Sequence, residues 1–400
     1  MKLLIVSPKF DPVIGGGETF VLNPALLLYK AGIDVSVAAE PNAQREMKNY
    51  PFTVYEINGL SDTHLDVISA SEGLSELTKQ LKPDLIHVHG YLALLAIGLC
   101  GINQRVPILA SIHSTPVWGE RLIGMMDSFE EELSFARNVI DLARPQIITA
   151  ANEVYAEAAR KVVQGRVKVI TVPYPVDLDS FHRQDNPVLR RKLGLTEKDI
   201  LILTPSRIIE RKGIREIVYA LDDLPDNFYL CLPAAFSPLD KRFWDDITAS
   251  DIYQRVKNRV IIPDKQFLYL DMPLLYAASD IVAMPSYYEG APVATVEAMA
   301  SGKPFIGADS QGINSFIRDN ENGLLVPQKT VKELAAGIYK LAQDKELCAR
   351  LSQRALAGIA YLSWDVQLRN LINIYNQLMA TGETNVPADL SIPHAKTLVQ

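Results

Sequence analysis

Two glutamates, Glu289 and Glu297, stand eight positions apart directly after a largely apolar run, 280–286. The run is typical of a buried strand, and the stretch 293–301 predicts a helix. Glu289 therefore lies in the loop at the strand's carboxyl end, and Glu297 about one turn inside the helix. Open α/β sheets bind ligands at this edge, and a helix N-terminus suits a phosphate. Two acids beside an anion site fit hydroxyl groups, which a sugar nucleotide offers on both sides of its diphosphate.

Three cations occupy a second strand end, because the segment 204–213 reads Thr-Pro-Ser-Arg-Ile-Ile-Glu-Arg-Lys-Gly. Arg207, Arg211 and Lys212 stand between a predicted strand and a predicted helix. Such a group can bind a diphosphate and stabilise it as it leaves. The alternative is ordinary solvated surface, since loops are exposed by default.

A glycine-rich turn follows the first predicted strand. Gly15, Gly16 and Gly17 can bring backbone N–H groups close to a ligand. The turn does not match G-x-G-x-x-G, so a nicotinamide site is not indicated. A flexible turn without a ligand is the alternative.

Histidines mark two further strand ends. His113 ends the β-rich run 108–113, where it could hydrogen-bond a sugar hydroxyl, shuttle a proton or serve only as a structural hydrogen-bonding group. His87 and His89 share one strand face and would suggest a metal. Neither a cysteine nor a third ligand stands near them in the sequence, so we predict no metal site.

The composition limits the class of protein. A length of 400 residues indicates two domains. Hydrophobic residues at 48% with charged residues at 22% are typical of a globular protein, and a net charge of −7 argues against nucleic acid as a partner. Three scattered cysteines fit free thiols in a reducing compartment. We found neither a signal peptide nor a membrane span, and therefore expect a cytoplasmic protein.

Predicted strands and helices alternate, which indicates parallel sheets covered on both faces. The pattern breaks at 172–176, where two prolines favour extended backbone, and then restarts. We expect two Rossmann-like β/α/β domains facing a cleft, over 1–175 and 176–363, a helix over 364–380 that crosses back to the first domain, and a loose tail over 381–400. The expected strands are 2–7, 35–39, 85–89, 108–113, 147–150, 167–171, 199–205, 228–232, 260–262, 280–286 and 305–307, and the main expected helices are 19–31, 213–221, 270–278 and 293–301.

Taken together, these residues resemble the retaining glycosyltransferases of family 4, which have the two-domain GT-B fold. The resemblance covers most of residues 1–380. The motifs that carry it are the pair Glu289 and Glu297, Arg207 with Lys212-Gly213, the glycines of 15–17, Asn-Gly-Leu-Leu-Val at 322–326, and Ser363-Trp364 followed by Tyr375.

The resemblance implies roles for the charged residues. Arg207 and Lys212 would bind the diphosphate of a nucleotide-sugar donor, and Glu297 the ribose hydroxyls. Glu289 would bind the transferred sugar, and His113 would reach the same sugar. Because cations and a helix dipole stabilise the leaving group, neither a metal ion nor another cofactor is expected.

Backbone groups complete the implied site. N–H groups of Gly290, Ala291 and Val293 would contact sugar and phosphate, whereas Gly16 and Gly17 would close over the diphosphate. The identity of the acceptor is left open. Residues 51–78 contain neither Lys nor Arg, so a soluble acceptor is favoured. Peripheral membrane contact is the alternative that stays open.

Several positions depart from the family pattern. Ser206 with Arg207 replaces the usual Gly-Arg, and the usual linker Pro-Asn-Gly-Val-Asp is Pro-Tyr-Pro-Val-Asp at 173–177. Pro263 replaces a common glycine. These departures leave one alternative open, a subunit that binds a nucleotide sugar without catalysis. A second alternative keeps the fold and changes the reaction, to that of a sugar-nucleotide epimerase or a phosphorylase.

Overall fold

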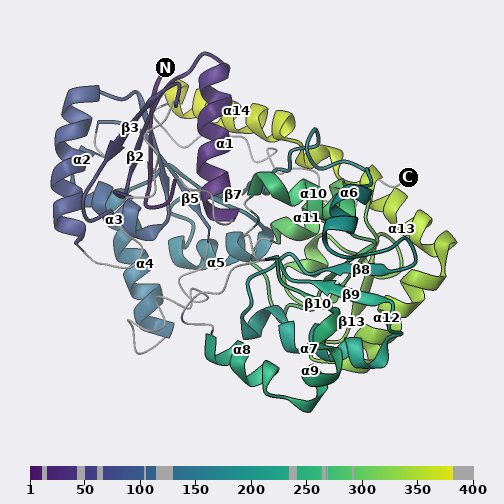
Figure 1. Cartoon of the computed structure of the whole chain (residues 1–400). Helices are drawn as coiled ribbons and strands as arrows, with labels where there is room; N and C mark the ends of the chain where they lie inside the picture. The colour runs from purple at the N-terminus through teal and green to yellow at the C-terminus, as the bar shows by residue number, and fades with distance from the viewer. Residues whose placement is uncertain are drawn as a thin grey trace. The chain divides into compact units, whose positions relative to one another are not determined.

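The computed structural model describes residues 1–10, 16–42, 50–60, 66–102, 105–113, 129–233, 241–263, 267, 269–290 and 292–381. The chain divides into two compact units. Unit 1 comprises Met1–Tyr174 and Asp365–Gln400, and unit 2 comprises Pro175–Trp364. Each unit has a central parallel sheet with helices against it (Figure 1). The predicted fold class, two Rossmann-like domains, is confirmed.

The described residues of unit 1 form a seven-stranded sheet in the order β3-β2-β1-β4-β5-β6-β7. All of its strand pairs are parallel. The inner strands β4 and β6 are buried at every position, because helices cover both faces of the sheet. The strands are β1 Lys2–Ser7, β2 Asp34–Ala39, β3 Thr53–Glu56, β4 Leu85–His89, β5 Ile108–Ile112, β6 Ile147–Ala150 and β7 Lys168–Thr171.

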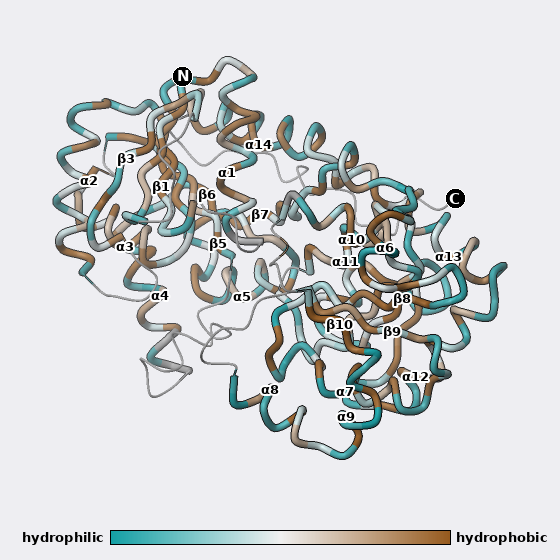
Figure 2. The backbone as a smooth tube through the Cα atoms, viewed as in Figure 1, coloured by the Kyte–Doolittle hydropathy of each residue, from teal (hydrophilic) through white to brown (hydrophobic). Residues whose placement is uncertain are grey.

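Alternate residues of these strands pack into two hydrophobic cores, one on each face of the sheet. Leu4 and Val6 pack with α2 to α5, whereas Leu3 and Ile5 pack with α1 and with Tyr375 of the last helix. Figure 2 shows the brown, hydrophobic strands between these helices. The helices are α1 Gly16–Lys30, α2 Val67–Leu81, α3 Tyr91–Leu99, α4 Phe129–Ala143, α5 Glu153–Val163 and α14 Trp364–Thr381.

The described residues of unit 2 form a six-stranded parallel sheet in the order β10-β9-β8-β11-β12-β13. Its core is also divided between the two faces. The strands are β8 Ile200–Leu203, β9 Phe228–Cys231, β10 Val260–Ile261, β11 Ile281–Met284, β12 Phe305–Ala308 and β13 Leu324–Val326. The helices are α6 Pro187–Lys192, α7 Ile214–Ala220, α8 Lys241–Thr248, α9 Asp251–Val256, α10 Met272–Ala278, α11 Val293–Ala300, α12 Val331–Gln343 and α13 Lys345–Ala357.

Element boundaries required corrections of a few residues. The predicted helix 19–31 begins earlier, at Gly16, and the predicted strand 199–205 is shorter, as β8. The helix predicted over 270–278 is a short 3₁₀ turn, Tyr269–Asp271, followed by α10. The edge strands β3 and β13 were not predicted. The expected tail, 381–400, lies outside the described residues except for Thr381, which ends α14.

Candidate active site

The strand order of unit 2 marks where a ligand can bind. β8 and β11 are neighbours although the chain leaves them toward opposite edges of the sheet, which makes a switch point between them. In open α/β sheets, ligands bind outside the carboxyl ends of the strands at this point. The loop after β8 carries Arg207, Arg211 and Lys212, and the loop after β11 carries Glu289. Both loops singled out in the sequence therefore flank the switch point.

Two close backbone contacts hold these loops together. Gly213 has a φ of +67°, and a Cβ at this position would lie 2.2 Å from the carbonyl oxygen of Pro285. A residue with a side chain would therefore force the loops apart. The backbone N–H of Tyr287 also donates to the carbonyl oxygen of Arg211, at 2.8 Å.

Lys212 and Glu289 form a buried ion pair across the two loops. The Lys212 ammonium donates to Glu289 Oε1 at 2.5 Å and to Oε2 at 2.7 Å. The side chains are only 13% and 6% exposed, so water screens this pair little. Arg211 Nη1 lies 4.0 Å from Glu289 Oε2, and the Arg211 guanidinium also lies over the ring of Tyr288.

The charges of this cluster perturb one another. Burial would raise the pKa of the Glu289 carboxyl, but the charge and hydrogen bonds of Lys212 outweigh burial and hold this pKa below its usual value. Burial lowers the pKa of Lys212, and the charges of Arg211 and Arg207 act in the same direction against the pull of Glu289. Lys212 and Arg211 share one carboxylate, and the charge of Arg207 also acts on Lys212, so an anionic ligand would neutralise the remaining positive charge.

A glycine holds Glu289 in place from a third loop. Gly312 has a φ of +93°, and a Cβ there would lie 2.1 Å from the carbonyl oxygen of Glu289. The N–H of Glu289 donates to the carbonyl oxygen of Gln311 at 2.8 Å. The backbone of Glu289 is therefore fixed by the segment that follows β12.

Glu297 lies in α11 and is 5% exposed. The hydroxyl of Tyr276, in α10, hydrogen-bonds to Glu297 Oε2 at 2.8 Å and to the carbonyl oxygen of Ala294 at 3.1 Å. Burial raises the pKa of Glu297 to about 7, although the Tyr276 hydroxyl lowers it. Oε1 accepts no hydrogen bond from the residues that the structure describes. This carboxyl is thus poised between two protonation states near neutral pH.

The other predicted contacts of unit 2 are placed as follows. Arg207 is exposed in the loop after β8. Gly290 follows Glu289 and is half-buried, and Val293 is the first residue of α11. The remaining predicted contact, Ala291, lies outside the described residues.

In unit 1, a switch point lies between β1 and β4. Gly16 and Gly17, both predicted as ligand contacts, form the first turn of α1, the helix that follows β1. Gly15 lies outside the described residues. The loop after β5, next to β4, begins with His113.

Both ring nitrogens of His113 contact protein groups. Nε2 is 2.8 Å from Nδ1 of His89, at the end of β4, and Nδ1 contacts the hydroxyl of Tyr174. The rings of His89 and His113 are nearly parallel, at 6°. Burial lowers the pKa of His89 well below its usual value, and His87 and His113 lower it further. The structural hydrogen-bonding role left open for His113 is therefore present, and contact with a sugar stays a prediction.

His87 belongs to a separate hydrogen-bonded chain. Its Nδ1 is 2.7 Å from the hydroxyl of Tyr375 in α14, and its Nε2 is 2.7 Å from Ser111 Oγ. Burial lowers its pKa to about 3, so the ring is neutral. Within the described ranges, no cluster of three or more His, Cys, Asp or Glu residues could hold a metal ion.

Sequence reasoning missed three of these contacts. Tyr276 and Gly312 support the two glutamates from other segments, and no local pattern pointed to either. Tyr174 is the third, and the unusual residue in the linker was a signal that could have found it.

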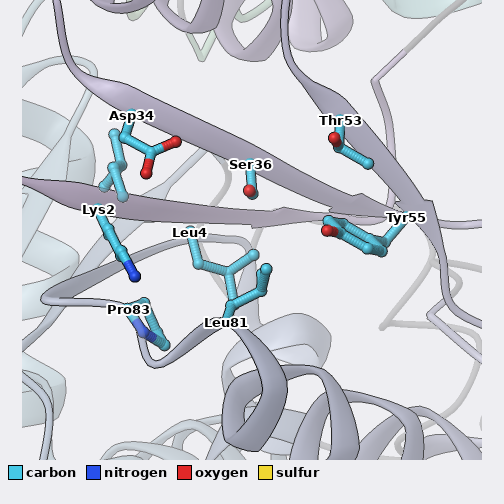
Figure 3. Close-up of a pocket in the computed structure, with 9 residues that line it drawn as sticks. Lys2, Leu4, Asp34, Ser36, Thr53, Tyr55, Leu81 and Pro83 are labelled. Carbon is cyan, nitrogen blue, oxygen red and sulfur yellow. The ribbon is translucent and has the colours of Figure 1, made fainter.

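A separate cavity of about 220 Å³ lies in unit 1 (Figure 3). It lies where β1, β2 and β3 begin and beside the connection from α2 to β4, away from the carboxyl ends of the strands. The candidate site of unit 2 is instead assigned to the Lys212–Glu289 ion pair beside the switch point of that unit, because ligands of α/β sheets bind at the carboxyl ends of the strands. The residues that line the cavity are Lys2, Leu3, Leu4, Asp34, Ser36, Thr53, Tyr55, Leu81 and Pro83.

None of the helices in the described part of the chain is long and apolar enough to cross a membrane.

Two Rossmann-like units, with a last helix that mostly belongs to the first of them, define the GT-B class of fold. Comparison with known families and structures supports this class. The model described as "Glycosyltransferase Family 4" matches residues 14–180, and that of "Glycosyl transferases group 1" matches residues 185–357.

Named relatives match over most of the chain. A D-inositol 3-phosphate glycosyltransferase of Salinispora tropica is 33% identical, over 95% of this chain and 85% of the relative. Another, from Nocardia farcinica, is 25% identical, over 90% of this chain and 84% of the relative. The chain belongs to glycosyltransferase family 4.

Solved structures show the same fold. Sucrose-phosphate synthase from Thermosynechococcus elongatus superimposes with a TM-score of 0.80 at 20% identity, over 94% of this chain and 99% of the synthase. Anabaena HepE in complex with UDP and glucose gives a TM-score of 0.78 at 19% identity, over 94% of this chain and all of HepE.

Proposed function

We propose that this glycosyltransferase moves a sugar from a nucleoside diphosphate sugar to an acceptor with retention of the anomeric configuration. The observation that carries the proposal is the buried pair of Lys212 and Glu289 at the switch point of unit 2, with Glu297 buried in α11, the next helix along the chain. This arrangement offers separate groups to an anion and to hydroxyls, as a nucleotide sugar requires.

The cations would hold the diphosphate. An ammonium has three protons, so Lys212 can keep a hydrogen bond to Glu289 while it donates to a phosphate oxygen. Arg207, exposed in the same loop, can turn toward the ligand and add a bidentate contact. Each such contact stabilises the transition state by about 2–4 kcal/mol, as judged from donors to a developing oxyanion.

The two glutamates would hold hydroxyls. Glu289 is kept ionised by Lys212 and can accept hydrogen bonds from the transferred sugar. Glu297 Oε1 can accept from the ribose, while the Tyr276 hydroxyl keeps Oε2 in place. Binding would favour the ionised form of Glu297, because a carboxylate accepts from two hydroxyls at once.

The transfer would take place on one face of the sugar. The bond between the anomeric carbon and the diphosphate oxygen breaks, and its electron pair stays with the diphosphate. The acceptor oxygen attacks the same carbon from the same face, and its proton passes to the departing phosphate oxygen. Lys212 and the arginines stabilise the charge that develops on the leaving group. Because these cations supply that stabilisation, we propose that no divalent metal or other cofactor is obligatory.

A melting-temperature panel of nucleoside diphosphates and their sugars tests the proposal, since a ligand that binds the native state raises its stability. UDP and UDP-glucose come first, because HepE was solved with UDP and glucose. Inositol 3-phosphate is the first acceptor, because several relatives are named for it.

We expect one nucleotide to raise the melting temperature of the wild type, with and without EDTA, and not that of Lys212→Ala. Equal shifts in the wild type and Lys212→Ala would show that Lys212 does not contribute to nucleotide binding. No shift and no turnover with any donor would overturn the proposed function.

A further inference from the structure

Tyr174 departs from the family pattern, which has an asparagine at this place in the linker. It is the last residue of unit 1 before the boundary, and Pro175 follows it. Its ring stacks on Phe20 of α1, with ring centroids 3.4 Å apart and planes at 12°. Its hydroxyl contacts Nδ1 of His113. One side chain therefore joins the helix that starts at the glycine-rich turn to the histidine at the end of β5.

The ring and the hydroxyl of Tyr174 have separable roles. The ring of Tyr174 packs against Phe20, which fixes the side chain. Pro175 also restricts the backbone of Tyr174. With the ring held in this way, the hydroxyl contacts Nδ1 of His113. A phenylalanine would keep the packing and lose only the hydrogen bond.

The other ring nitrogen of His113 contacts His89, which a ligand hydroxyl could replace. Nδ1 of His89 lies 2.8 Å from Nε2 of His113, and His89 is 5% exposed. A sugar hydroxyl can both donate and accept, so it can replace His89 at Nε2 whichever tautomer His113 adopts. The Tyr174 hydroxyl can likewise donate to or accept from Nδ1 in either tautomer, so its hydrogen bond to His113 can persist when a sugar binds.

We propose that Tyr174 is a positioning residue of the transfer reaction: its hydroxyl holds His113 by Nδ1, so that Nε2 can pass from His89 to a hydroxyl of the transferred sugar. The inference rests on the proposed function and on the role that the family resemblance implies for His113, contact with the transferred sugar. Tyr174 acts through His113 and does not itself contact the substrate.

Tyr375 provides a matched control in the same unit. Its hydroxyl lies 2.7 Å from Nδ1 of His87, so Tyr375→Phe also removes one tyrosine hydroxyl from one histidine. The comparison separates loss of a tyrosine–histidine hydrogen bond, which both variants share, from loss of His113 orientation, which only Tyr174→Phe causes.

The first measurement needs no substrate. The chain has six histidines, so a ¹⁵N-histidine-labelled sample gives a resolvable set of ring signals. His113 is assigned with His113→Gln, and His87 with His87→Gln. Tyr174→Phe should shift the ring nitrogens of His113, and Tyr375→Phe those of His87. Unchanged His113 signals in folded Tyr174→Phe would overturn the proposal.

The second measurement is turnover, followed as release of nucleoside diphosphate from the donor that most stabilises the wild type. We expect Tyr174→Phe to lower kcat about 10–100-fold, because small misplacements of a positioned group cost this much, with the donor KM within about twofold. Tyr375→Phe should keep the wild-type kcat.

The outcomes separate this inference from the proposed function. If the wild type turns over and Tyr174→Phe keeps its kcat, Tyr174 has only a packing role and the inference fails while the proposed function stands. If both tyrosine variants lose kcat equally, the effect is general and the inference fails too. A wild type that turns over no donor overturns the proposed function and, with it, this inference.

Discussion

Replacing Glu297 with glutamine should make the protein more stable at alkaline pH. Burial raises the pKa of Glu297 from 4.5 to about 7. The folded protein therefore keeps this proton over a range of pH in which the unfolded chain has lost it. The stability of the wild type then falls as the pH rises from about 4.5 to 7, and the full penalty is present above pH 7.

The size of this penalty follows from the same two pKa values. A difference of one pKa unit corresponds to about 1.36 kcal/mol, so the rise to about 7 corresponds to roughly 3 kcal/mol. Glutamine has no charge to bury and avoids this penalty. For a domain of the size of unit 2, about 1 kcal/mol shifts the melting temperature by about 2–4 °C. The advantage of Glu297→Gln should therefore grow by about 6–12 °C between pH 4.5 and pH 8.

The assay is a melting-temperature series over this pH range for the wild type, Glu297→Gln and Glu197→Gln. Glu197 is an exposed glutamate of the same unit and controls for loss of a surface charge. The pH dependence of the difference is the quantity of interest, because any effect of the amide itself on stability is independent of pH. A difference between Glu297→Gln and wild type that does not change with pH would refute the reasoning.

Two further predictions concern the loops at the switch point. Lys212→Ala should raise the activation free energy that corresponds to kcat/KM by about 2–4 kcal/mol. It should also destabilise the fold, because Glu289 keeps a buried charge. Adding Glu289→Gln should restore the melting temperature without restoring activity, and recovery of activity would contradict the assignment. Gly312→Ala and Gly32→Ala both place a side chain at positive φ, at a cost of about 1–2 kcal/mol. Only at Gly312 does the new Cβ meet backbone, that of Glu289, whereas nothing lies within 4 Å at Gly32. Calorimetry should therefore show a larger loss of stability for Gly312→Ala than for Gly32→Ala, and only Gly312→Ala should weaken donor binding. Equal losses of stability in the two variants would count against the contact between Gly312 and the backbone of Glu289.

Most of the fold could be predicted from apolar runs. β1, β4 and β6 have the predicted bounds, because strands buried on both faces read as short segments rich in apolar residues. β3 was missed because it is an edge strand with two exposed residues, and its sequence, Thr-Val-Tyr-Glu, lacks such a run. The helix α1 begins at Gly16, where glycine composition predicted a turn.

The candidate site could be predicted only in part. The sequence identified Lys212 and Glu289 as site residues but could not show their ion pair, since they are 77 residues apart and meet only because β8 and β11 are neighbours. Strand order is a property of the whole sheet and leaves no local pattern. For the same reason, the contact of Tyr276 with Glu297 required the packing of α10 against α11.

The anomeric configuration of the product tests the central claim most directly. The donor selected by the melting-temperature panel is incubated with the enzyme and its acceptor, or with water alone, and ¹H NMR follows the anomeric proton while ³¹P NMR follows the diphosphate. The proposed chemistry predicts that the first product formed keeps the configuration of the donor, as free nucleoside diphosphate accumulates. An inverted product, or loss of the sugar signal without release of nucleoside diphosphate, would contradict it.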